Sequence, residues 1–146
     1  AGSIDAFAAS EPTPSLAEQK GGRELITFGG LGNQYPIMML AHTSFLINRE
    51  KDFLCFVVAL RSAEAFVRKN QAETVEILSD ATGLPLEVTR RAMKRHSYGL
   101  KLDEVILSSL RDTAQFLKDQ NKIKQLPNLS IAAMPHFLKR QTEVRN

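Results

Sequence analysis

The spacing of hydrophobic residues changes about a third of the way along the chain. Before residue 45, apolar residues occur in three short runs, separated by stretches rich in glycine and proline: IDAFAAS at 4–10, ELITF at 24–28 and YPIMMLAH at 35–42. Short apolar runs bounded by turn residues are typical of buried β-strands. The first part of the chain therefore predicts three strands, with a helix beginning near Pro12 after the first of them.

From about Arg49 onward the spacing is helical. An apolar face at intervals of three and four residues predicts one helix of about 20 residues, and its members are Phe53, Phe56, Val57, Leu60, Ala63 and Val67. Further helices are predicted over 72–82, with Gly83 as a left-handed C-cap, from Pro85 onward, and over 102–123. After Pro127 the pattern supports one short helical turn at best.

Together these patterns predict an α/β fold in which a few strands precede a helix-rich C-terminal portion. Three short strands expose edges that another element must pair or cover. The sequence therefore looks like the later part of a larger structure.

Composition and charge exclude few classes of protein. The chain has 146 residues, 43% hydrophobic and 24% charged, which is ordinary for one globular domain. No apolar run approaches the roughly 20 residues that cross a bilayer, and the first residues lack the pattern of a signal peptide. The single cysteine, Cys55, has no partner for an internal disulfide, and its apolar neighbours place it in a core.

The stretch ATGLPLEVTRRAMKRH at 81–96 has the pattern of a helix-turn-helix DNA reader, with four basic side chains on its second helix. Those cations lie toward the C-terminal end, however, whereas the N-terminal end offers Pro85, Leu86 and Glu87. A carboxylate there repels phosphate, and cations at the other end complement the helix dipole. A solvated basic face is the favoured interpretation, so no nucleic-acid partner is expected.

The order of the motifs resembles a family of binding proteins. GSIDAFAASEPTPSLAEQKGG is similar to a stretch in the substrate-binding proteins of ABC importers for sulfonates, taurine and nitrate. The matching positions are Gly2, Ile4, Asp5, Ala6, Glu11 and Pro12, with Gly21 and Gly22 closing a helix. The strand RELITF, the long helix, the TGLP turn and the later helix follow in the same order as in that family.

The resemblance implies a two-lobed fold of the periplasmic-binding-protein type, of which this chain forms the C-terminal half. Residues 1–22 then end the second lobe, 23–32 form the crossing strand or hinge, and 33–146 complete the first lobe. The implied partners are a small-molecule ligand, an ABC permease at the membrane, and either the N-terminal half or a second copy of the chain. The implied location is periplasmic, or extracellular and membrane-associated.

The implied ligand site lies at the start of the first helix. Free backbone N–H groups there suit a sulfonate, nitrate or carboxylate, and Ser10 and Thr13 add hydroxyl donors. Glu11 repels such an anion unless the ligand also carries an amine or the side chain points away. Ordinary helix capping is the alternative role for Ser10, Glu11 and Thr13.

The expected function is to bind a small anion without converting it, as the solute-binding component of an importer, with no catalytic residue, metal or cofactor. One alternative is an enzyme that resembles the pyrimidine synthases of thiamin biosynthesis, for which His42 and His136 are the residues to substitute. The other alternative is a helix-turn-helix DNA-binding protein.

Overall fold

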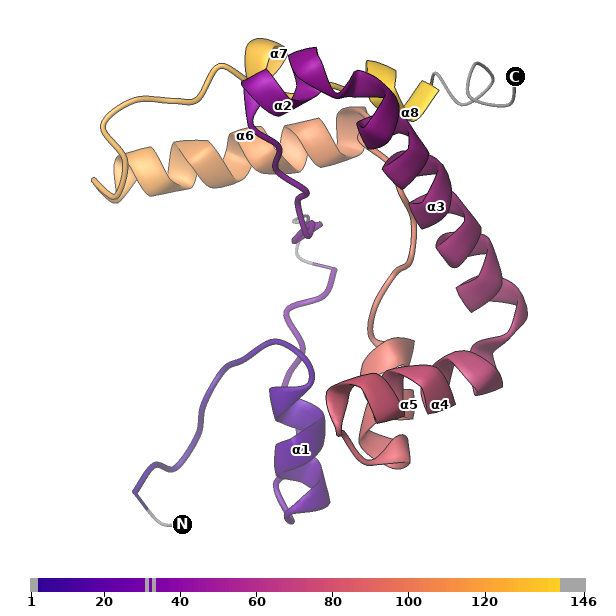
Figure 1. The fold of residues 1–146 in the computed structure, drawn as a ribbon. Coiled ribbons are helices and arrows are strands. Elements are labelled where there is room, and N and C mark those ends of the chain that lie inside the picture. Colours follow the sequence, from indigo (N-terminus) through magenta and orange to yellow (C-terminus); the bar gives the residue numbers. More distant parts are fainter. Residues whose placement is uncertain (1–2, 31, 33, 140–146) are drawn as a thin grey trace. The chain divides into compact units, whose positions relative to one another are not determined.

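The computed structural model of the chain describes residues 3–30, 32 and 34–139 (Figure 1). Within these residues the regular structure is entirely helical, so the predicted α/β fold class is wrong. The helices are α1 (Thr13–Gln19), α2 (Thr43–Asn48), α3 (Glu50–Lys69), α4 (Gln71–Thr82), α5 (Leu86–Lys94), α6 (Glu104–Asp119), α7 (Leu129–Ala132) and α8 (His136–Lys139).

The three runs predicted as strands have no regular structure. Their side chains suit a strand, but a strand also needs a neighbour whose N–H and C=O groups complete a ladder. None of the described residues forms such a ladder, and the apolar side chains of the three runs are largely exposed. The prediction failed because apolar spacing reports on side chains and says nothing about the pairing partner.

The predicted helices after residue 49 are confirmed, but Cys55 and Phe56, which were predicted to be buried, are exposed. α3 is 20 residues long, α4 and α5 begin within a residue or so of their predicted starts, and α6 is somewhat shorter than predicted. Asp103 caps α6, because its carboxylate accepts a hydrogen bond of 3.1 Å from the Ile106 N–H. The tail differs from the prediction of at most one short turn, since it contains both α7 and α8.

The chain divides into two compact units. Unit 1 consists of Ala1–Thr27 and Glu64–Tyr98. In it, α5 packs against both α1 and α4, and the buried apolar side chains are Val75, Val88 and Ala92. The α1 helix ends at Gln19, and Gly21, two residues later, has a φ of 91°, in the region that favours glycine.

Unit 2 consists of Phe28–Ala63 and Gly99–Asn146. The rings of Phe53 and Phe137 meet edge to face with their centroids 4.9 Å apart. Leu54, Val57 and Ile106 are buried there.

The predicted boundaries at residues 22 and 32 depend on the family resemblance and stay a prediction. None of the described helices is long and apolar enough to cross a membrane.

We expect Gly83→Ala to lower the free energy of unfolding by about 1 kcal/mol, because Gly83 has a φ of 69° and a side chain in that region is strained. No other atom lies within 4 Å of the added Cβ, so the strain comes from the backbone alone. Gly83→Asn should cost less, since asparagine tolerates this conformation. Urea unfolding measures both; an alanine variant as stable as the parent contradicts the C-cap.

Candidate functional site

Two arginines, Arg91 of α5 and Arg95 at the C-cap of α5, hold glutamates from the N-terminal part of unit 1. Arg95 contacts three carboxylates, at 2.7 Å from Glu11, 3.3 Å from Glu18 and 2.6 Å from Glu24. Arg91 is 2.6 Å from Glu18. Arg91 and Arg95 are four residues apart and so lie on one face of α5. We call these five residues the glutamate–arginine cluster; it joins α1 and the residues beside it to α5.

The three residues predicted to bind ligand lie at the start of α1, where Glu11 has a structural role. Its side chain is only 7% exposed, and it accepts hydrogen bonds from Arg95 and, at 3.4 Å, from the Ser15 N–H. The Glu11 carboxylate therefore takes the place beside the helix N-terminus that an anionic ligand was predicted to occupy. Ser10 and Thr13 are exposed, and the Ser10 carbonyl accepts a bond of 3.2 Å from the Thr13 N–H.

Glu11 and Glu18, the two less exposed glutamates of the cluster, are held ionised. Partial burial opposes ionisation of Glu11, but the hydrogen bonds from Arg95 and Ser15 outweigh it, so the pKa of Glu11 lies below its ordinary value of 4.5. The hydrogen bond from Arg91 is the largest influence on Glu18, and it lowers the pKa of that carboxyl also. The cluster is therefore a set of charged pairs at neutral pH.

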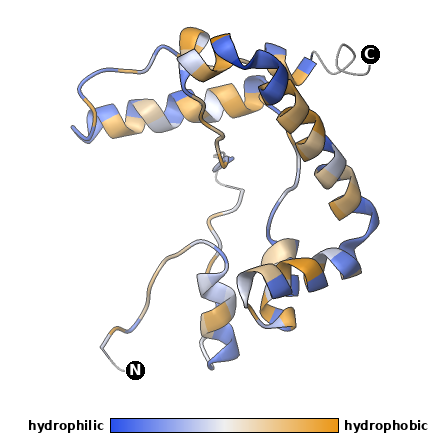
Figure 2. Ribbon diagram, viewed as in Figure 1, coloured by the Kyte–Doolittle hydropathy of each residue, from blue (hydrophilic) through white to orange (hydrophobic). Residues whose placement is uncertain are grey.

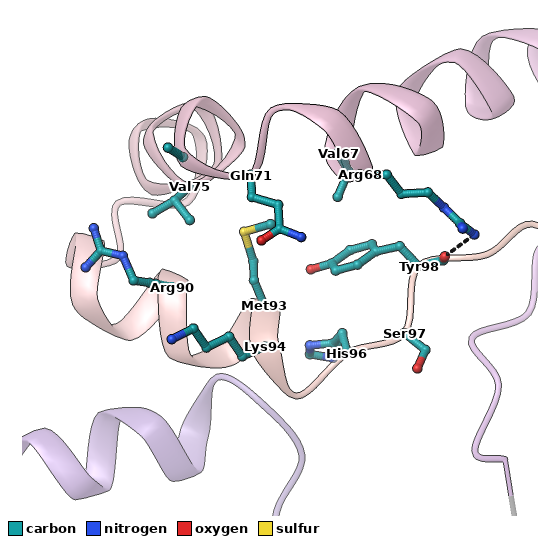
Figure 3. Close-up of a pocket in the computed structure, with 11 residues that line it drawn as sticks. Val67, Arg68, Gln71, Val75, Arg90, Met93, Lys94, His96, Ser97 and Tyr98 are labelled. Carbon is teal, nitrogen blue, oxygen red and sulfur yellow. Dashed lines mark hydrogen bonds between the residues drawn. The ribbon is translucent and has the colours of Figure 1, made fainter.

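A cavity of about 750 Å³ lies on the α4 side of α5, within unit 1 (Figure 3). This volume is within the range of small-molecule sites. The lining side chains come from the end of α3, from α4, from α5 and from the residues that follow α5: Val67, Arg68, Gln71, Ala72, Val75, Arg90, Met93, Lys94, His96, Ser97 and Tyr98. None of these eleven residues is acidic, whereas three are basic: Arg68, Arg90 and Lys94.

The three cations of the cavity differ in their partners. Arg68 bonds Glu64 at 2.7 Å and the Tyr98 carbonyl oxygen at 3.0 Å, and Arg90 bonds Glu87 at 2.6 Å. Lys94 forms no ion pair with any residue that the structure describes. It lies four residues after Arg90, and so on the same face of α5. Lys94 is therefore the cation of the cavity that is available to an anionic ligand.

Two further polar groups line the cavity. The Nδ1 atom of His96 is 2.8 Å from the Ala92 carbonyl oxygen, which can only accept, so Nδ1 carries the hydrogen and Nε2 is left for another partner. Burial raises the pKa of Tyr98, so its hydroxyl stays protonated at neutral pH and can donate. Around an anion the cavity offers Lys94, Tyr98 and Gln71 as donors, beside the apolar surface of Val75 and Met93.

Sequence reasoning missed this cavity because its residues meet only when α3, α4 and α5 pack. In the sequence, Lys94 is one of several basic residues and nothing sets it apart. The sequence does not show that Arg91 and Arg95 pair with glutamates, whereas Lys94 does not. The pairing of Arg95 with Glu11 spans 84 positions. The one available signal was the four-residue spacing of Arg90 with Lys94 and of Arg91 with Arg95.

The histidines considered for an enzyme have local structural contacts in unit 2. His42 caps α2, since its Nδ1 accepts from the Ser44 N–H at 3.3 Å. The His136 ring packs on Phe137 with centroids 4.3 Å apart. Among residues 3–30, 32 and 34–139, no group of three His, Cys, Asp or Glu side chains is placed to hold a metal ion.

Compared with protein-family models, with curated proteins and with solved structures, the chain matches none. Its function has to be inferred from its own residues.

The glutamate–arginine cluster makes stability depend on pH. Because the folded-state pKa values of Glu11 and Glu18 are lowered, their contribution is fully present above the ordinary value of 4.5 and is lost as the pH falls through the folded values. Urea midpoints measured between about pH 7 and about pH 3 should therefore fall more steeply for the parent than for the double variant Glu11→Gln, Glu18→Gln.

Glu76→Gln is the matched control, since Glu76 is an exposed residue of α4 outside the cluster. It should have the same pH dependence as the parent. Equal acid slopes for the parent and the double variant contradict a stabilising role of the cluster.

Proposed function

We propose that the chain binds a small organic anion without converting it, in the cavity between α4 and α5, and that it does so as the solute-binding component of an importer. The observation that carries the proposal is a cavity of about 750 Å³ with three cations and no carboxylate among its lining residues. A cavity with one sign of charge favours ligands of the opposite sign.

The lining favours an anion with a small apolar body. Arg68 and Arg90 are each neutralised by a glutamate of their own helix, which leaves the Lys94 ammonium to bind one anionic head group. Val67, Val75 and Met93 offer an apolar surface to the rest of the ligand. A sulfonate or a carboxylate on a short aliphatic or aromatic body has both features.

The importer role is supported by the stretch at 2–22 and by the order of the later helices, which resemble those of sulfonate, taurine and nitrate binding proteins. The strands of that resemblance are not formed by the described residues. In that role the chain delivers its ligand to a membrane permease and is located outside the cytoplasm. The cavity supports the proposal that the ligand is an anion, and the resemblance supports the proposal that the chain serves an importer.

One observation favours a DNA-binding function as the second candidate. α4, the turn at Gly83 and α5 are arranged as two packed helices joined by a tight turn, as in a helix-turn-helix. Three of the four basic residues at 90–95 are paired with glutamates: Arg90, Arg91 and Arg95. Neutralised cations release few counterions from DNA, so the anion-binding proposal is preferred.

Calorimetric titration of the full chain with benzenesulfonate, taurine and nitrate tests the proposal. We expect at least one anion to bind, and uncharged benzenesulfonamide to bind more weakly than benzenesulfonate. Lys94→Gln should weaken anion binding about tenfold or more, because it removes a charge-assisted hydrogen bond.

Lys51→Gln is the matched control, because it removes the same charge from an exposed position of α3 in unit 2. It should leave the affinity unchanged. The proposal is wrong if no anion of the set binds, or if the two lysine variants weaken binding equally. Binding of duplex DNA that weakens steeply with salt favours the second candidate instead.

A further inference from the structure

One stretch of unit 2 carries no charged side chain. Residues 34–48, QYPIMMLAHTSFLIN, contain no Asp, Glu, Lys or Arg, and His42 is their only titratable residue apart from Tyr35. We call this stretch the neutral segment. It includes α2 and the irregular chain before it, and Figure 2 shows the latter in the colours of hydrophobic residues.

The apolar side chains of the neutral segment are exposed to an unusual degree. Ile37, Leu40 and Ile47 are 91%, 88% and 75% exposed, and Met38 and Met39 are also exposed. Single exposed apolar residues are common on protein surfaces, whereas several exposed apolar residues along one segment favour an interaction surface. A partner that covers this segment removes apolar area from water, which is the main driving force of protein association.

The absence of charge indicates what kind of partner fits. In a symmetric dimer the same patch occurs on both subunits, so a patch with net charge brings like charges together. The neutral segment avoids this repulsion along its whole length. The first charged residue after it, Arg49, is paired with Asp52 at 2.7 Å, so the border is also close to neutral.

A second copy fits this surface better than a charged partner or an anionic lipid surface. A charged partner would find no opposite charge in the segment, and an anionic membrane surface attracts basic residues, which the segment lacks. We propose that two copies of the chain associate through the neutral segment, with Ile37 and Leu40 at the centre of the interface. This proposal does not depend on the ligand cavity, which belongs to unit 1.

Sedimentation velocity of the full chain, from about 1 μM to about 100 μM, tests the proposal. We expect the parent to form a dimer within this range. The double variant Ile37→Lys, Leu40→Lys should sediment as a monomer throughout, because it places like charges opposite each other in the interface. Both side chains are almost fully exposed, so the substitutions remove little packing within the chain.

The matched control is the double variant Val105→Lys, Ile131→Lys. These side chains are also apolar, exposed and in unit 2, at 56% and 71%, but they lie outside the neutral segment. The control should remain a dimer. A parent that stays monomeric, or a dimer that persists in the Ile37→Lys, Leu40→Lys variant, overturns the proposal.

Amide hydrogen exchange of the parent provides a second readout that needs no variant. Residues 35–48 should exchange more slowly at the high concentration than at the low one. Slowing elsewhere with no change in these residues places the contact on another surface and overturns the proposal. A monomer whose neutral segment is instead covered by vesicles or by a different polypeptide also overturns it, and identifies another occupant.

Discussion

Unit 1 depends on one guanidinium group. Arg95 binds Glu11, Glu18 and Glu24, which come from before, within and after α1. A single side chain at the C-cap of α5 therefore fixes three points of the N-terminal part of the chain. An exposed ion pair contributes little to stability, but a network of pairs around a mostly buried carboxylate contributes more. Without Arg95, the Glu11 carboxylate would be left buried with its main partner missing, a cost of about 1–3 kcal/mol.

The same cluster determines which cations face the cavity. α5 carries two pairs of basic residues with a spacing of four, offset by one position, so the two pairs point in directions about 100° apart. Arg91 and Arg95 face α1 and are neutralised by glutamates within it and beside it, whereas Arg90 and Lys94 line the cavity. The basic residues of this helix thus lie on two faces. One face pairs with glutamates, and the other lines the cavity.

This division explains what could be predicted from the sequence. The helices α3 to α6 were predicted well, because each shows its buried face as a local repeat of apolar residues. The prediction of three strands was wrong. A strand needs a pairing partner from a distant segment, and the apolar spacing of a run does not show whether such a partner exists. Glu11 was predicted to bind the ligand. Its partner Arg95 lies 84 positions later, so the pairing of the two side chains could not be seen in the sequence.

The central claim is that the glutamate–arginine cluster holds α1 on α5. Amide hydrogen exchange of α1 in the parent and in Arg95→Gln tests it most directly, with Arg90→Gln as a control on the other face of the same helix. The account predicts that exchange in α1 becomes about tenfold faster or more in Arg95→Gln, while α1 in Arg90→Gln exchanges as in the parent. Unchanged exchange of α1 in Arg95→Gln would contradict it.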